Sequence, residues 1–164
     1  MILRSIAFAG GLAGAATTAQ FPEFSQQYLQ RLGGAVDALG EVVADFDASA
    51  AASDLSRADA LAQMQGTPFL ERRGQDMARS ITRYERLSAD LQRLEGQGPF
   101  MRAYHVGSFT DTEIAQAAWA AYQPAVPVTF AGLSFAGVGF VLGSLAVSLA
   151  AGLLRLPFRR RQRA

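Results

Sequence analysis

One long apolar segment near the C-terminus constrains this chain more than any other feature. Residues 128–154 carry no formal charge over 27 positions. As a helix they would extend roughly 40 Å, which exceeds the roughly 30 Å hydrocarbon core of a bilayer and leaves room for tilt. Large apolar side chains surround this helix and leave it no polar face. The segment is therefore predicted to cross a membrane rather than to form the core of a soluble protein.

A second uncharged segment lies at the N-terminus. Residues 5–21 are built largely of Ala, Gly and Thr, with few large apolar side chains. Two interpretations remain open: a retained transmembrane helix, or a signal peptide with Arg4 as its basic region and a small-residue cleavage site at 17–19. The aromatic exit segment that follows, with Phe21 and Phe24, favours retention.

The arginines predict the orientation of the chain. Residues 21–127 hold nine arginines and all fourteen carboxylates, a net charge of −5. The other six arginines lie at the two ends of the chain: Arg4, Arg155, Arg159, Arg160, Arg161 and Arg163. Because cationic flanks stay in the cytoplasm, both termini are expected there, and the acidic middle lies outside, in the periplasm of a Gram-negative cell. The terminal arginines are also expected to contact lipid headgroups.

Small residues recur at a heptad-like spacing along both apolar segments. The second segment has Gly132, Ala136, Gly139, Gly143, Ala146 and Ala150, and the first has Ala7, Gly11, Gly14 and Thr18. Membrane helices associate where small side chains let two backbones approach, since lipid tails solvate Leu as well as another helix does. We expect these helix-packing seams to pair the two segments with each other. Self-association and docking on another membrane protein are the alternatives.

Between the apolar segments the sequence is helical. An apolar stripe with helical spacing predicts a helix over residues 22–48, and a short helix is expected from about Ser53. Thr67-Pro68 is an N-cap followed by proline, and it starts a second long helix that ends at Gly96. Strand patterns are absent. Two long amphipathic helices joined by a short connector predict an antiparallel hairpin of some 40 Å.

A further helix is predicted before the second apolar segment. Thr110 and Glu113 have the spacing of a capping box, so a helix is expected over residues 111–122. Aromatic residues near both apolar segments are typical of membrane-interface anchors. The predicted anchors are Phe21, Phe24, Tyr28, Trp119 and Tyr122. Packing against the first long helix is the alternative role for Trp119 and Tyr122.

The sequence offers little chemistry. It has no cysteine and one histidine, His105, so a metal centre and a His-based acid-base pair are not expected. We interpret His105 as a packing or capping residue, and Glu41, Asp45 and Asp47 as a solvated face. Carboxylates interspersed among the arginines of residues 72–95 disfavour nucleic-acid binding. No cofactor is predicted.

The segment FPEFSQQYLQRL at residues 21–32 follows the first apolar segment, and Tyr122-Gln123-Pro124 leads into the second. With these residues the chain resembles an uncharacterised family of two-span proteobacterial membrane proteins that carry a domain of unknown function. The resemblance implies a topology with both spans retained. It implies no activity and no site residues.

The sequence therefore predicts an all-α membrane protein with two transmembrane helices flanking a helical-hairpin extramembrane domain. Its expected parts are a first transmembrane helix (or signal peptide) at 1–21, the extramembrane domain at 22–125, a second transmembrane helix at 126–155 and a basic cytoplasmic tail at 156–164.

From these parts we expect a non-enzymatic accessory, scaffold or assembly component of a bacterial inner-membrane complex. Its expected partners are the bilayer and another membrane protein or a second copy of itself, with no nucleic acid and no metal. The alternative is a periplasmic sensor or ligand-binding module. An enzyme would need titratable groups to converge around His105, Asp111 or Glu113.

Overall fold

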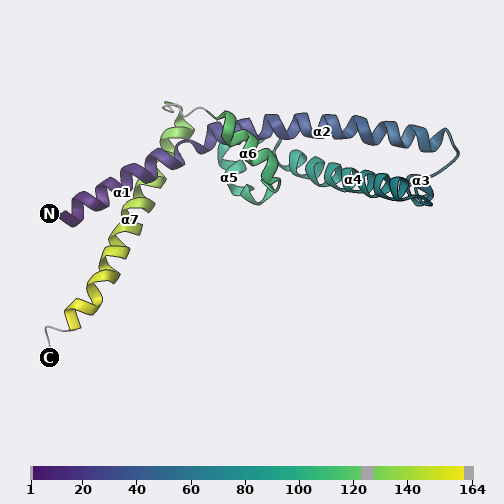
Figure 1. Cartoon of the computed structure of the whole chain (residues 1–164). Coiled ribbons are helices and arrows are strands. Elements are labelled where there is room, and N and C mark those ends of the chain that lie inside the picture. Colours follow the sequence, from purple (N-terminus) through teal and green to yellow (C-terminus); the bar gives the residue numbers. More distant parts are fainter. Residues whose placement is uncertain (1, 123–127, 161–164) are drawn as a thin grey trace. The chain divides into compact units, whose positions relative to one another are not determined.

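The computed structural model describes residues 2–122 and 128–160. Within these ranges every regular element is a helix, which confirms the predicted all-α class (Figure 1). The chain divides into two units. Unit 1 comprises residues 1–26 and 122–164, and unit 2 comprises residues 27–121.

Unit 1 contains the candidate membrane span. Its two main helices are α1 (Ile2–Thr18) and α7 (Phe130–Arg160). Within α7, Phe130–Leu153 is long and apolar enough to cross a membrane. Only 6% of its most apolar stretch of 18 residues is buried. The core helix of a soluble protein would be mostly buried, so this exposure agrees with the predicted span. The shorter α1, of 17 residues, is a helix as predicted, and its role as a second span stays a prediction.

Unit 2 is built on the predicted hairpin. The helices α2 (Phe21–Ala51) and α4 (Pro68–Leu94) lie side by side (Figure 1), and Gly40 of α2 faces the ring of Tyr84 on α4. The glycines at 33, 34 and 40 leave α2 unbroken, because a glycine inside a helix costs only about 1 kcal/mol. The short helix α3 (Arg57–Gln63) lies between the two long helices in the chain.

The remaining elements of unit 2 follow α4. They are the helix α5 (Pro99–Tyr104), the 3-10 turn η1 (Val106–Ser108) and the helix α6 (Thr112–Ala121). Apolar side chains from three helices form the core. They are Tyr28, Leu32 and Val43 of α2, Ile81, Leu87 and Leu94 of α4, and Ile114 and Ala118 of α6.

The helix ends follow local chemistry. The Thr67 hydroxyl accepts the N–H of Leu70 at 3.2 Å, so the predicted start of α4 is confirmed. Its predicted end is confirmed as well, since Gly96 adopts the left-handed region at φ +71°. The prediction for α3 was four residues early, because Ser56 rather than Ser53 accepts the first free N–H, that of Asp59.

The helix α5 was not predicted, although Pro99 stands at the first helical position, where proline is well tolerated. The six residues of α5 are too few to show a helical period of apolar residues.

Candidate functional site

The contact between α1 and α7 is the tightest helix packing in unit 1. It pairs Gly14 with Gly139 and Gly10 with Gly143, so rising numbers on α1 meet falling numbers on α7 and the two helices run antiparallel. A Cβ atom added at Gly14, Gly139 or Gly143 would lie under 3.0 Å from backbone atoms of the opposite helix. Only glycine therefore fits at these positions, as expected where two backbones touch.

Side chains extend this contact at both ends. The hydroxyl of Thr18 donates to the carbonyl oxygen of Phe135 at 2.6 Å. The ring of Phe8 meets Phe140 edge-on at 5.5 Å, and Phe21 lies 5.3 Å from Phe135 between ring centroids. A polar contact and an aromatic contact thus accompany the glycine contact between α1 and α7, and Phe21 at the start of α2 adds a second aromatic contact.

The structure brings most of the predicted seam residues together. Gly11, Gly14, Gly139 and Gly143 lie in the α1–α7 contact, and Gly132 is buried. Ala7 and Ala136 are half-buried, whereas Ala146 and Ala150 are exposed. Sequence reasoning omitted Gly10 because it lies outside the heptad spacing, although a Cβ there would meet Val147. The opposite face is open, since nothing lies within 4 Å of a Cβ at Gly137.

A polar cluster lies in unit 2 between α4 and the start of α6. The carboxylate of Asp111 is buried and accepts hydrogen bonds from Arg83 and Arg86, each at 3.2 Å. Arg83 also contacts Glu113 at 2.8 Å. The hydroxyl of Thr110 donates to Asp90 at 2.6 Å. A hollow of about 300 Å³ lies here, lined by Arg83, Arg86, Thr110, Asp111, Thr112 and Glu113.

The predicted capping box is wrong by one residue. Asp111 caps α6, because its Oδ1 accepts the N–H of Ile114 at 3.1 Å. Thr110 and Glu113, the expected capping pair, instead bond to α4. The physical reason is the pair of arginines on α4, which draws both side chains away from the helix start.

The pKa of Asp111 reflects competing effects. Burial alone would raise it, but the N–H of Ile114 and the positive charges of Arg83 and Arg86 outweigh burial, and the pKa lies below its usual range. Asp111 is therefore ionised at neutral pH and balances the two guanidinium groups.

Tyr28 was predicted to be a membrane-interface anchor, and the structure gives it another place. It is fully buried in unit 2, where its ring stacks on Phe109 at 4.5 Å and its hydroxyl accepts the backbone N–H of Asp111 at 3.4 Å. A side chain without exposed surface cannot reach lipid headgroups. Burial also raises the pKa of the Tyr28 hydroxyl above its ordinary value.

The other predicted anchors have different surroundings. Phe21 and Phe24 are half-buried in unit 1, and the Tyr122 hydroxyl bonds to the side-chain oxygen of Gln20 in the same unit. Trp119 is largely exposed on α6 in unit 2. Trp119 therefore keeps the surface that an interface anchor needs.

The remaining predicted residues add no site. His105 is the C-cap of α5, with its N–H bonded to the Met101 carbonyl at 2.9 Å. Asp47 pairs with Arg57, which holds the pKa of that carboxyl below its usual range. In the described part of the chain, no group of three or more acidic or histidine side chains could hold a metal ion. Arg4 is exposed, and the arginines at 155–163 lie beyond the side chains that the structure describes.

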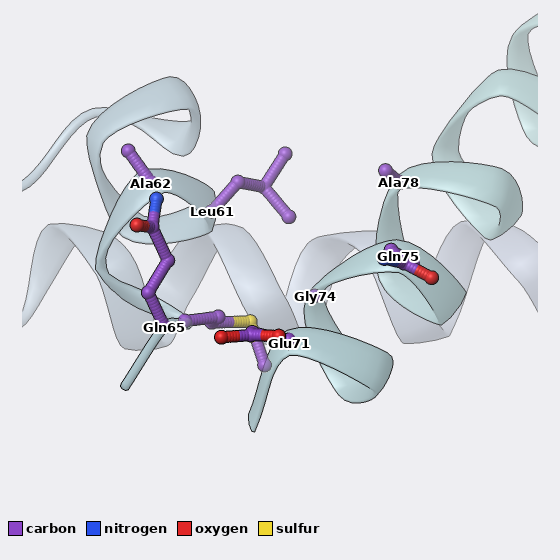
Figure 2. Close-up of a pocket in the computed structure, with 8 residues that line it drawn as sticks. Leu61, Ala62, Gln65, Glu71, Gly74, Gln75 and Ala78 are labelled. Atoms are coloured by element: carbon purple, nitrogen blue, oxygen red, sulfur yellow. The ribbon is translucent and has the colours of Figure 1, made fainter. Parts of the chain in front are cut away.

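A hollow of about 500 Å³ lies between α3 and α4 (Figure 2). Leu61, Ala62 and Gln65 line it from the α3 side, and Glu71 and Gln75 from α4. Glu71 is the only titratable residue among those that line it, so the hollow lacks the paired groups of an acid-base site.

These features define a class: an all-α protein with a candidate membrane helix, a second helix packed on it through glycines, and a helical-hairpin unit. The chain belongs to a family described as a protein of unknown function, DUF2937, whose model matches residues 2–160. The family match confirms the resemblance to an uncharacterised family. No curated protein and no solved structure matches the chain.

Proposed function

We propose that this protein is a non-enzymatic accessory or scaffold component of a bacterial inner-membrane complex. In this proposal α1 and α7 both cross the membrane, both termini are cytoplasmic, and unit 2 lies in the periplasm, where it contacts a partner protein. The exposed apolar surface of α7 carries the proposal. Its exposed large side chains are Phe130, Leu133, Val138, Val141, Leu142, Leu145, Leu149 and Leu153.

This surface favours lipid over water as its solvent. Burying one such side chain away from water is favourable by about 1.5 to 3 kcal/mol, so eight exposed side chains on one helix would be costly in the aqueous phase. Ile6, Phe8 and Leu12 extend the exposed apolar surface onto α1. Hydrocarbon around both helices removes this cost.

The glycine contact supports α1 as a retained second span. Cleavage of a signal peptide at residues 17–19 would remove α1 and uncover Gly139 and Gly143 on α7. Because no larger side chain fits this interface, the glycines of α7 are best explained if α1 is retained. The α1–α7 contact also occupies the glycine seams of both helices, so a partner would contact the outer faces of the helices or unit 2.

The polar groups of unit 2 support a non-enzymatic role. Arg83, Arg86, Asp90, Asp111 and Glu113 are paired with one another or with Thr110. His105, the only histidine, is absent from this cluster. A paired ionic cluster stabilises a fold, whereas general acid-base catalysis needs a group free to exchange a proton with substrate.

Site-directed photo-crosslinking in native membranes tests this proposal. A photoreactive residue replaces exposed Phe69 of unit 2 in one variant and exposed Leu145 of α7 in another. We expect a protein adduct of one defined size from Phe69 or Leu145, with Leu145 also linked to lipid. A chain that stays in the supernatant when membranes sediment would refute the membrane anchor, and lipid adducts alone would refute the scaffold role.

A second candidate is a periplasmic ligand-binding module, favoured by the hollow beside Asp111. Its arginines already bind carboxylates, so an anionic ligand would have to displace Asp111 or Glu113. Titration of the full-length protein with small carboxylates and phosphate, followed by thermal unfolding, separates the candidates. A saturable rise in the unfolding temperature would favour the ligand-binding module.

A further inference from the structure

We propose that α5 and η1 form a lipid-docking patch that lies on the headgroup surface of the membrane. The patch consists of Phe100, Met101, Tyr104 and Val106, which are 48%, 45%, 79% and 59% exposed. Phe100, Met101 and Tyr104 occupy positions i, i+1 and i+4 of α5, so they project within an arc of about 100°. A cluster of exposed large apolar side chains marks a surface for an interaction partner.

The patch lies at the end of unit 2 from which the chain continues into unit 1. Tyr28, the second residue of unit 2, packs on Phe109 directly after η1. The last residue of unit 2, Ala121, ends α6, and the following eight residues lead to α7. Nine peptide steps reach at most about 32 Å. This inference rests on the proposed function: if α7 crosses the bilayer, this end of unit 2 stays near the membrane surface.

The charges around the patch fit a lipid surface. Residues 98–110 contain no carboxylate, whereas residues 21–127 as a whole carry a net charge of −5. Arg102 supplies a positive charge within α5 itself. Aromatic and apolar side chains beside an arginine are typical of helices that lie in the headgroup region, where anionic lipids attract the cation.

Another exposed aromatic residue provides a comparison. Phe69 at the start of α4 is also exposed, but Glu71 follows it closely, whereas residues 98–110 contain no carboxylate. Phe69 lies in the first turn of α4, close in sequence to α3. It is remote in sequence from residues 27 and 121, where unit 2 joins unit 1. Phe69 therefore serves as a matched control for the patch.

Spin-label depth measurements test the inference on the full-length chain. Because the chain has no cysteine, single labels are introduced without removing native thiols. Val106→Cys reports the patch, Leu145→Cys reports the span and Ser53→Cys reports the connector beyond α2. The protein is reconstituted in vesicles of phosphatidylethanolamine and phosphatidylglycerol. Oxygen, which concentrates in the bilayer, and a water-soluble nickel chelate serve as relaxation agents.

We expect the label at residue 145 to lie deep in hydrocarbon, the label at 106 at headgroup depth, and the label at 53 in water. The label at 53 should be several-fold more accessible to nickel than the label at 106. A deep label at 145 with a fully aqueous label at 106 would overturn the lipid-docking patch and leave the proposed function intact. An aqueous label at 145 would overturn both. Protection of the label at 106 from both agents would indicate a protein contact and overturn lipid docking.

A variant pair strengthens the test. The double change Phe100→Ser with Met101→Ser removes apolar surface and should raise the nickel accessibility of the label at 106 several-fold. Phe69→Ser should leave it unchanged. Equal effects of the two variants would overturn the inference. Circular dichroism checks that both variants keep their helix content. If the double variant unfolds, the depth of the label at 106 in the chain without these serine substitutions tests the lipid-docking patch.

Discussion

At the scale of single residues, Asp111 connects α6 to the hairpin of unit 2. Its carboxylate caps α6 through the N–H of Ile114 and balances Arg83 and Arg86 of α4. A buried carboxylate with three such donors is well satisfied. Removal of its charge would leave the half-exposed guanidinium groups of Arg83 and Arg86 without the carboxylate that they share, so a charge-assisted hydrogen bond from each would be weakened.

We therefore expect Asp111→Asn to destabilise unit 2. The amide keeps an oxygen for the cap but loses the charge, so the free energy of unfolding should fall by about 1 to 3 kcal/mol. Denaturant unfolding of the detergent-solubilised chain, followed by circular dichroism, measures the change. The control is Glu113→Gln, where the side chain is 76% exposed and a loss of at most about 0.5 kcal/mol is expected. Equal losses in both variants would contradict this account.

Asp111 also predicts a dependence of stability on pH. Its folded pKa is lowered, because the Ile114 N–H and the two arginines outweigh the effect of burial, and the unfolded value is about 3.9. The resulting stabilisation is complete above about pH 5 and is lost progressively as the pH falls through the folded pKa. The unfolding temperature of the native chain should drop more steeply in acid than that of Asp111→Asn. Parallel pH profiles for the two proteins would refute the prediction.

At the scale of elements, the α1–α7 pair depends on close backbone approach on one face only. Gly139 touches Gly14 and Thr18, whereas Gly137 lies two residues away on the same helix and faces open space. The two glycines thus offer a matched pair of positions. The same substitution at both positions changes the hydrophobicity of α7 equally. A difference between the two variants therefore reports packing against α1.

Gly139→Leu should separate α1 from α7, and Gly137→Leu should not. The leucine at 139 would overlap backbone atoms of Gly14, so the helices must move apart or tilt. Spin labels at Leu12 and Leu142, both exposed, allow the interhelical distance distribution to be measured by double electron-electron resonance. We expect a longer or broader distribution for Gly139→Leu alone. Identical distributions in both variants would show that the glycine contact does not hold the pair.

At the scale of the whole molecule, the distribution of arginines predicts which parts share a side of the membrane. Single cysteines at Ser5, before most of α1, and at Ser53, in unit 2, report the two sides. An impermeant maleimide added to intact spheroplasts should label Ser53→Cys and reach Ser5→Cys only after permeabilisation. The reverse pattern would place unit 2 in the cytoplasm, and labelling of both would contradict a spanning α1.

Local interactions explain what could be predicted from the sequence about this protein. Thr67-Pro68 starts α4 and Gly96 ends it because these signals act over three or four residues. The helical class and the candidate span follow from the spacing of apolar residues along single helices. The glycines of α1 and α7 were found because a contact between helices needs small side chains at the helical period.

Only the tertiary structure decided which long-range partners each side chain meets. Tyr28 has the position of an interface anchor in the sequence, but it packs beside Asp111, 83 positions away. Thr110 and Glu113 have the spacing of a capping box, but two arginines some 24 to 30 positions earlier bind them instead. A local pattern describes what a side chain can do with its neighbours along the chain. Folding adds competitors from elsewhere, and the stronger electrostatic or apolar contact then prevails.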